Sequence, residues 1–499
     1  MLNILHHSSL RFLFAGAIFS LLLTFLVFGL GRGSSLGFEG LGGDAQPGPY
    51  TLKSSSHCGN TASELNTVTQ TNTSNQTEWG QGKEWSFTPH RDANNHGLSE
   101  AQCLLAFPKL FGEIDRVAQK YLTKNQLITF QDVDDVHRRG GIDGNGNGLV
   151  RAAIVDGKLY ILDFGPQPFT FSRGKATLHS LNRALTAYAG RRTLPNIEFV
   201  LSTDDFVPDQ EQGPIWSYSR RYGDEVGNGD WNEQTSSSGS ASGIWLMPDF
   251  GYWSWPEVKV GSYSDIRRRI ADVDGGLRFK NKKKQLLWRG SVASNPEIRG
   301  ALLSATRGKP WSSTREINWD TSSQEDADNG ILPMESHCTY QFLAHTEGRS
   351  FSGRGKYLLS CGSVVIAHKP LWAEMHHGAL ISSGPEANYV QVERDFSDLE
   401  RKIEHLLDNP EVAERIAVNA FATFGERYLS PAAESCYWRA LVRAYGGVSG
   451  FEPLLEVERT TGKKESGKGK GARVSIWKWV LHGVMIYEGI YGLAFGSGF

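Results

Sequence analysis

The sequence contains few cysteines, and they are widely spaced. Five occur among 499 residues, at Cys58, Cys103, Cys338, Cys361 and Cys436. No two have the C-x-x-C spacing of a zinc knuckle or a thioredoxin-like redox site, which argues against both. A secretory compartment would permit one or two disulfides with one thiol left over, but sequence spacing does not reveal the pairing. Cys361 lies in an apolar run, where we expect a buried thiol rather than a nucleophile.

The chain also lacks an excess of charge of either sign. Its 52 Lys and Arg residues oppose 54 Asp and Glu residues, which gives a net charge of −2. Nucleic-acid-binding proteins usually carry a basic surface, so this balance does not favour a nucleic-acid partner. The length exceeds what one hydrophobic core usually supports and predicts two or three domains.

Only one long uncharged apolar run occurs, near the N-terminus. Phe12–Gly31 is long enough to cross a bilayer as a helix and is bracketed by Arg11 and Arg32. No clear small-residue cleavage site follows it, so we expect an uncleaved signal anchor rather than a removed signal peptide. Residues 1–11 would then form a short cytosolic tail.

Residues 32–90 are rich in Gly, Ser, Thr, Asn and Gln and predict a disordered luminal stem. Asn72 and Asn75 each begin a glycosylation sequon. Anchor and stem together predict a single-pass type II membrane protein of the Golgi or another compartment of the secretory pathway. At the C-terminus, residues 456–499 predict a linker followed by an apolar tail, to which the sequence assigns no function.

Aromatic residues are abundant, with 14 Trp and 16 Tyr. They could fill a large core, or stack on the C–H faces of sugars. Trp253 and Trp255 belong to a dense aromatic cluster that fits a hydrophobic plug and an acceptor or sugar pocket equally well.

Residues 91–275 predict an N-terminal α/β half. Ser99 and Gln102 have the spacing of a capping box at a helix start. Val150–Ile154 and Lys158–Leu162 are joined by two turn residues and predict a β-hairpin. Ile197–Ser202 predicts a short buried strand.

Two carboxylates, Asp204 and Asp205, follow the Ile197–Ser202 strand. Open α/β sheets bind ligands at the C-terminal ends of their strands, so one of the two is a candidate general base. A turn-forming or helix-capping role is the simpler alternative.

Residues 276–455 predict a second α/β half. Gln285–Trp288 reads as a buried strand, and Asn295 can cap a helix that begins at Pro296. Helix and strand segments then alternate as far as a final helix over Ala432–Tyr445.

Arginines in this second half stand close to glycine turns and helix starts. Arg299 lies one turn into the predicted helix, and Arg354 follows the Ser352-Gly353 turn. Helix N-termini and guanidinium groups both bind phosphate oxygens. The pattern therefore predicts an anion site suited to a diphosphate.

Several short motifs keep an order and spacing that resemble one family. They are Gly97-Leu98-Ser99-Glu100-Ala101-Gln102-Cys103 with Phe107-Pro108, Leu194–Glu198 through Asp205, Trp288-Arg289-Gly290-Ser291 with Arg299, Ser352 with Arg354 and Lys356, Cys361-Gly362-Ser363, and Trp372 with Glu374. From about Gly97 to Gly446 the chain resembles the CAP10 family, glycosyltransferase family 90. That family includes fungal capsule-associated xylosyltransferases and animal protein O-glucosyltransferases.

The resemblance implies a GT-B fold, with two Rossmann-like halves and a cleft between them. It also implies a UDP-sugar donor, inversion at the anomeric carbon, and no metal or other cofactor. Ser291, Arg299, Ser352 and Arg354 would bind the diphosphate in place of a divalent ion, and Glu374 would contact the nucleotide ribose.

The family's general base stands in an Asp-Tyr-Pro setting that aligns with Asp205. Here Phe206 replaces the Tyr and the Pro comes later, at Pro208, so Asp204 stays open as the base.

The resulting hypothesis is a membrane-anchored inverting glycosyltransferase. It would transfer xylose or glucose to a hydroxyl of a glycan or protein. One alternative is a non-catalytic, membrane-anchored carbohydrate-binding protein, suggested by the aromatic content. Another is a hydrolase using Asp204 and Asp205 with Glu374, which the lack of a G-x-S-x-G motif weakens.

Overall fold

The computed structural model describes residues 85–140, 148–165, 170–205, 213–222, 243–255, 260–317 and 330–453. The predicted tail 1–11, the anchor 12–31, the stem up to residue 84, the sequons at Asn72 and Asn75, and the tail 456–499 lie outside these ranges. Within them, no helix combines the length and the apolar character that a bilayer span requires.

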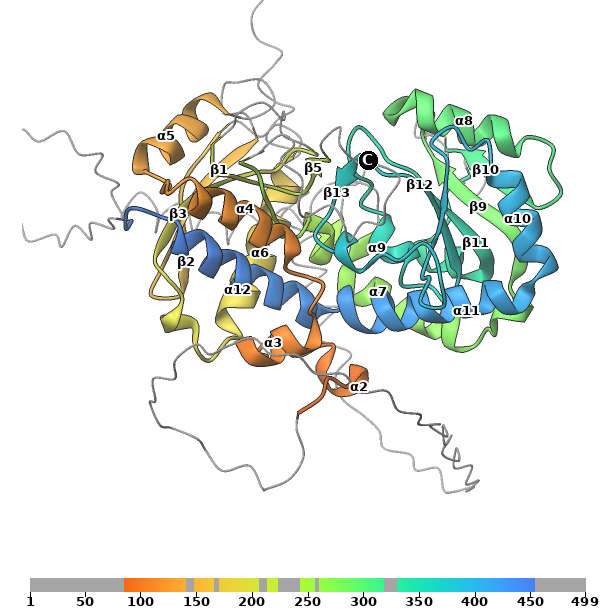
Figure 1. Ribbon diagram of the computed structural model, residues 1–499, viewed down its shortest axis with the longest axis horizontal. Coiled ribbons are helices and arrows are strands. Elements are labelled where there is room, and N and C mark those ends of the chain that lie inside the picture. Colours follow the sequence, from red (N-terminus) through yellow and green to blue (C-terminus); the bar gives the residue numbers. More distant parts are fainter. Residues whose placement is uncertain are drawn as a thin grey trace, which may run out of the picture. The chain divides into compact units, whose positions relative to one another are not determined.

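A five-stranded mixed sheet organises the first part of the described chain (Figure 1). In the order β2-β1-β3-β4-β6, its strands are β2 (Lys158–Phe164), β1 (Leu149–Val155), β3 (Ile197–Ser202), β4 (Ile215–Ser217) and β6 (Trp245–Leu246). β1 runs antiparallel to β2 and β3, whereas β3, β4 and β6 run parallel. The predicted β-hairpin is confirmed. Asp156 and Gly157 at its turn have positive φ angles of 51° and 68°, as a two-residue hairpin loop requires.

Helices from both ends of the described chain pack around this sheet. They are α3 (Glu100–Ala106), α4 (Gly112–Thr123), α5 (Phe130–Arg139), α6 (Phe171–Thr186) and α12 (Pro431–Gly447), and the short helix α2 (Pro89–Asp92) precedes them in the chain. The predicted capping box at the start of α3 is confirmed, because the Ser99 side chain accepts from the Gln102 amide and the Gln102 side chain from the Ser99 amide.

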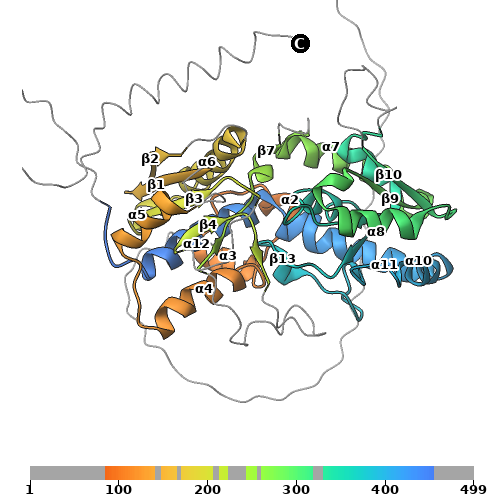
Figure 2. The same cartoon turned by 90° about the horizontal axis from the view of Figure 1, so that it is seen from above.

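Helix α12 lies in the part of the sequence predicted to form the second half, residues 276–455, but it packs with the first half. It comes from the C-terminal end of the described chain, yet it packs on α6, α4, α3 and β3 (Figures 1 and 2). The reason is its apolar character, since most of its side chains are buried, including Trp438, Leu441 and Tyr445. The chain therefore crosses back to the first sheet before it ends.

The second sheet is parallel throughout. In the order β10-β9-β11-β12-β14, its strands are β10 (Ser312–Glu316), β9 (Lys283–Gly290), β11 (Tyr340–His345), β12 (Val364–His368) and β14 (Val390–Val392). The helices of this part are α7 (Tyr263–Gly275), α8 (Pro296–Thr306), α9 (Gly355–Leu358), α10 (Leu399–Asp408) and α11 (Pro410–Ala420), which continues as a π-helix over Phe421–Tyr428. Asn295 caps α8 as predicted, with its side chain accepting from the Ile298 amide at 3.2 Å.

The order of this sheet reverses at β9. The chain first passes from β9 to the outer strand β10, and then returns to place β11 on the opposite side of β9. In open α/β sheets such a reversal leaves a crevice beyond the C-terminal ends of the two central strands. The loops that follow β9 and β11 are therefore expected to bind a ligand.

The cysteines form two disulfides among the described residues. Cys103 of α3 bonds to Cys436 of α12, and Cys338 bonds to Cys361. The expectation of a free thiol at Cys361 was wrong, because a 3-10 helix over Met334–Thr339 brings Cys338 against the end of α9. Cys58 lies outside the described residues.

Candidate active site

A cleft of about 300 Å³ lies between loops of the two sheets. From the first sheet it is lined by Asp205, which follows β3, and by Arg173 of α6. From the second sheet it is lined by the loops after β9 and β11, including Ser291, Arg299 of α8 and Arg354. The loops at the reversal of the second sheet thus form one wall of the cleft, as the strand order predicts.

Two guanidinium groups lie side by side in this wall. The side chain of Arg299 donates from Nε to the Glu347 carbonyl at 3.0 Å and from Nη1 to the Ser291 carbonyl at 2.7 Å. Both Arg299 and Arg354 lie against the ring of Trp288, with their Cζ atoms 5.9 and 5.8 Å from its centroid. Within the described part of the chain, no carboxylate forms an ion pair with either arginine.

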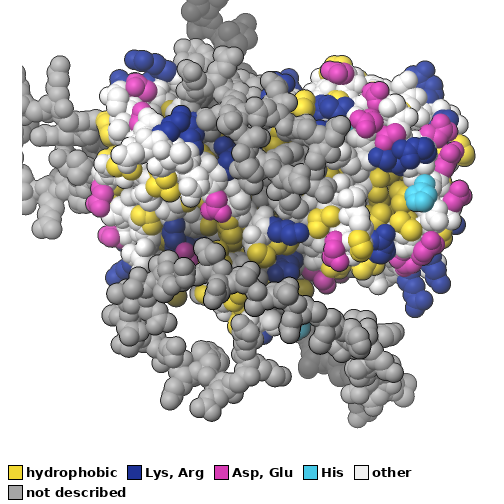
Figure 3. All heavy atoms as spheres, in the orientation of Figure 1, with side chains coloured by type: hydrophobic (Ala, Val, Ile, Leu, Met, Phe, Trp, Pro, Cys, Tyr) yellow, Lys and Arg dark blue, Asp and Glu magenta, His cyan; other side chains and the backbone are white. Residues whose placement is uncertain are grey.

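The lack of a paired carboxylate distinguishes Arg299 and Arg354 from the charged side chains of the surface. On the face in Figure 3, basic and acidic side chains are interspersed over the part of the molecule that carries α8 and α10. In the cleft, burial lowers the pKa of Arg299 to about 10, and burial together with the charge of Arg299 lowers that of Arg354 to about 9. Both groups still carry their charge at neutral pH, so an anion between them would relieve their repulsion.

Glycines allow the backbone to approach these arginines closely. A Cβ atom at Gly290 would lie 3.2 Å from the Nη2 atom of Arg354 and 2.8 Å from the ring of Trp288. A Cβ atom at Gly348 would lie 3.4 Å from the Nη2 atom of Arg299. A side chain at Gly290 would therefore displace the Trp288 ring against which both guanidinium groups lie.

Asp205 rather than Asp204 faces the cleft. Its carboxylate accepts a hydrogen bond from Arg173 at 2.6 Å, and 38% of its side chain is exposed. Its carbonyl accepts from Ser350 of the opposite wall at 2.8 Å, which fixes the backbone at this point. Asp204 is buried and packs against Gly148, where a Cβ atom would lie 2.5 Å from its carboxylate.

Arg173 was not predicted from the sequence. The apolar pattern typical of a helix starts only at Leu178, whereas α6 begins two turns earlier, at Phe171. The two additional turns carry Arg173 to the cleft, where its guanidinium group also lies over the ring of Phe250 at 4.8 Å.

Of the remaining residues predicted for the site, some line the cleft and others lie elsewhere in the structure. Ser291, Ser352 and Trp255 line the cleft, and the indole nitrogen of Trp255 has no hydrogen-bond partner among the described residues. Trp253 instead stacks on His179 of α6, with their centroids 5.0 Å apart. Glu374 is also away from the cleft, because it follows β13 (Trp372–Ala373), which pairs with β5 (Arg220–Arg221) of the first part of the chain.

His337 is a further cleft residue that sequence reasoning missed. It lies on the 3-10 helix over Met334–Thr339, where its Nδ1 atom is 3.2 Å from the Pro333 carbonyl. Burial, followed by the charge of Arg354, lowers the pKa of its imidazole to about 4, so the ring is neutral at pH 7. Apolar side chains, including Val260, Leu332 and Met334, line the cleft beside it. Short 3-10 segments have no clear apolar periodicity, so the sequence did not predict that His337 and these apolar side chains line the cleft.

Because His337 and His368 are buried, we expect the free energy of unfolding to fall as the pH is lowered. Burial lowers the pKa values of both His337 and His368 from 6.5 to about 4. Well above pH 6.5 both rings are neutral whether the chain is folded or not. As the pH falls below 6.5, the unfolded chain takes up protons first, so stability is lost until the pH approaches 4. Between pH 7.5 and 5.5 we expect each histidine to reduce the free energy of unfolding by roughly 1 kcal/mol.

Urea unfolding at a series of pH values measures this effect. The His337→Gln variant should show a shallower loss of stability with acid than the wild type. Equal pH dependence in the two proteins would contradict the prediction for His337.

Comparison with known proteins agrees with the earlier resemblance. The family model for glycosyl transferase family 90 matches residues 124–466, which is more than half of the chain. The chain belongs to this family. The match includes every residue of the cleft described above.

The named relatives of this family 90 protein have low sequence identity to it. The O-glucosyltransferase rumi homolog of Aedes aegypti is 27% identical over 225 residues, covering 42% of this chain and 54% of the relative. Protein O-glucosyltransferase 1 of Homo sapiens is 24% identical over 270 residues, covering 50% of this chain and 62% of the relative. The chain thus spans a little over half the length of these relatives. A solved structure, Anabaena Alr3699/HepE in complex with UDP-glucose, has 14% identity and a TM-score of 0.23 and covers 38% of this chain and 55% of that one.

Proposed function

We propose that this protein is an inverting glycosyltransferase that transfers a sugar from a UDP-sugar to a hydroxyl of a glycan or glycoprotein. The observation that carries the proposal is the pair of cationic side chains, Arg299 and Arg354, with no carboxylate partner among the described residues. A hydrolase or a carbohydrate-binding module has no need of two such groups, whereas a leaving diphosphate does. The two sheets on either side of the cleft agree with a GT-B arrangement.

The mechanism needs one proton transfer and one substitution. Asp205 accepts the proton of the acceptor hydroxyl as that oxygen attacks C1 of the donor sugar. The bond from C1 to the diphosphate oxygen breaks on the opposite face, and UDP leaves with the bonding electron pair. Arg299 and Arg354 stabilise the charge that develops on the diphosphate, so the reaction would need no metal ion. Arg173 holds the Asp205 carboxylate in place.

The donor sugar is glucose or xylose. The names of the relatives, which are O-glucosyltransferases, favour glucose. We further propose that residues 12–31 anchor the protein as a type II membrane protein and place the cleft in the Golgi or another secretory lumen.

The test is UDP release by the detergent-solubilised full chain from a panel of UDP-glucose, UDP-xylose, UDP-galactose and UDP-N-acetylglucosamine. We expect one of the first two to be consumed, at equal rates with and without a brief exposure to EDTA. Failure of the protein to bind UDP or to consume any donor would contradict the proposal. A rate that requires added Mn²⁺ would contradict the proposal that the transfer reaction needs no metal ion.

A further inference from the structure

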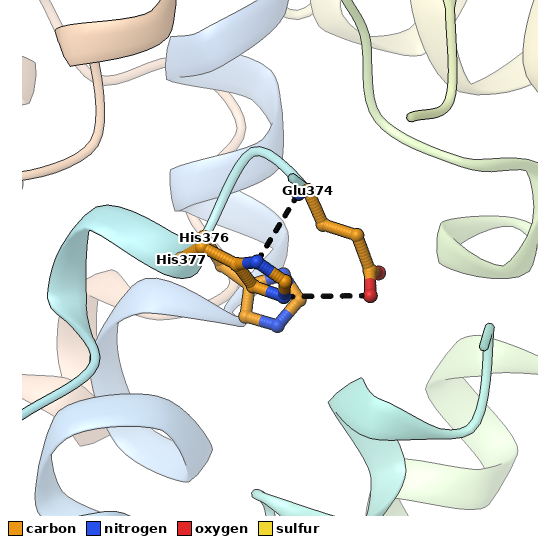
Figure 4. Close-up of side chains that lie close together, drawn as sticks. All are labelled: Glu374, His376 and His377. Carbon is orange, nitrogen blue, oxygen red and sulfur yellow. Dashed lines mark hydrogen bonds and ion pairs between the residues drawn. The ribbon is translucent and has the colours of Figure 1, made fainter. Parts of the chain in front are cut away.

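Three residues that could coordinate a metal ion converge outside the cleft. Glu374, His376 and His377 follow β13, and all three are buried. One ligand atom from each lies within 4.8 Å of the others, and Figure 4 shows both imidazole rings beside the Glu374 carboxylate. None of the three lines the cleft, so the cluster is separate from the proposed active site.

The contact between Glu374 and His377 suits two metal ligands better than a hydrogen bond. The Nε2 atom of His377 lies 3.5 Å from a carboxylate oxygen of Glu374, which is long for a charge-assisted hydrogen bond. Two ligands about 2.1 Å from a tetrahedral ion lie about 3.4 Å apart. Among the described residues, His377 is the only group in ion-pair range of this buried carboxylate. A cation between the Glu374 carboxylate and the Nε2 atom of His377 could be bound by both groups at once.

A neighbouring hydroxyl can orient the His377 ring for this role. The Nδ1 atom of His377 lies 3.4 Å from the hydroxyl oxygen of Tyr222 and at the same distance from the Glu374 amide nitrogen. In this structure Nδ1 accepts from the Glu374 amide. With an ion bound at Nε2, the ring proton would move to Nδ1 and be donated to the Tyr222 oxygen instead. Metal-bound histidines commonly use their second nitrogen in this way.

His376 has the burial of a metal ligand and no competing partner. Only 2% of it is exposed, and neither ring nitrogen hydrogen-bonds to another described residue. His345, which lines the same small cavity as His376, has a buried Nδ1 atom without a partner in the described part of the chain, and such atoms are costly and uncommon.

Two cavities adjoin the cluster. An enclosed space of about 30 Å³ is lined by His345, His376 and His377, and it is large enough for a water molecule or an ion. A second cavity of about 230 Å³ is lined by Glu374 and His377 and offers a route for an ion from solvent.

We propose that Glu374, His376 and His377 bind one Zn²⁺ ion, with the small cavity beside His345 providing the fourth ligand position. Two imidazoles and a carboxylate are a ligand set that zinc accepts. The ion would be structural. It would fix the segment after β13, which joins the second part of the chain to β5 of the first. Transfer in the cleft would remain metal-free, because none of the three ligands lines it.

The test uses the purified full chain and measures metal directly, without an activity assay. We expect stoichiometric zinc by elemental analysis, a lower unfolding temperature after prolonged dialysis against a chelator, and recovery on adding Zn²⁺. Co²⁺ added to the dialysed protein should give the visible absorption of a tetrahedral site. The His376→Gln and Glu374→Gln variants should lose this absorption. His179→Gln, which alters a partly exposed histidine that stacks on Trp253, should retain it.

Two results would overturn the proposal. One is a wild-type protein that contains no zinc, gives no Co²⁺ absorption and does not respond to Zn²⁺ in thermal unfolding. The other is undiminished metal binding by His376→Gln and Glu374→Gln, which would place the ion elsewhere. Because wild-type metal content decides the first outcome, the test does not depend on the variants folding.

Discussion

Replacing Arg354 by alanine should reduce UDP-sugar turnover by on the order of 10²–10³-fold while the protein remains folded. The guanidinium group lies in the cleft beside Arg299, and no described carboxylate pairs with it. Its charge is therefore available to the diphosphate, whose negative charge grows as the bond to the sugar breaks. Steady-state UDP release measures the loss. Arg354→Lys should recover only part of the activity, because an ammonium group cannot form the two parallel hydrogen bonds of a guanidinium group.

Stability separates this explanation from simple damage to the fold. Arg299 is buried and Arg354 is half-buried beside it, and two neighbouring cations without a counter-ion repel each other. Removing Arg354 should therefore leave the unfolding temperature unchanged or raise it. We expect Arg307→Ala, which removes an exposed arginine at the far end of α8, to change neither property. A large fall in unfolding temperature for Arg354→Ala, or turnover equal to that of the wild type, would contradict the assignment.

Arg299 is the less informative of the pair to replace. Its side chain donates to the carbonyl groups of Glu347 and Ser291 and so holds two loops of the cleft wall together. Truncating it would leave these carbonyls without a donor and would alter structure and charge at once. The side chain of Arg354 donates no hydrogen bond to another described residue, which makes it the cleaner test of charge alone.

Local patterns in the sequence predicted much of the fold. The capping box of α3, the β1–β2 hairpin, the strand β3 and the Asn295 cap of α8 depend on residues close together in the chain. The position of α12 on the first sheet could not be predicted in this way. Its sequence indicates only that it is apolar, and the surface it covers is set by contacts several hundred residues away, including the disulfide to Cys103.

The candidate site shows the same limit. The turns and helix starts beside Arg299 and Arg354 predicted an anion site, and the family resemblance added Ser291 to it. Sequence reasoning did not reveal Arg173 or His337, whose roles depend on where α6 begins and on an irregular segment. It also placed Glu374 with the donor, whereas the pairing of β13 with β5 carries that residue to the histidine cluster.

Asp205→Asn should reduce transfer to an acceptor by about 10²–10⁴-fold while UDP binding stays close to that of the wild type. The amide keeps the size of the side chain but cannot accept the acceptor's proton. The arginine pair, which holds UDP in this proposal, is on the opposite wall and is not altered. Transfer rates and UDP affinity, measured on the same protein, distinguish loss of the base from loss of the donor site.

Two companion variants resolve the choice between the adjacent aspartates. Asp204→Asn alters a buried carboxylate that packs behind the cleft, so we expect it to lower stability more than the rate of transfer. Arg173→Ala removes the ion pair that orients Asp205 and should slow transfer less than Asp205→Asn does, without weakening UDP binding. If Asp204→Asn abolished transfer and Asp205→Asn did not, the base would be Asp204, and the cleft would have to open differently when the acceptor binds.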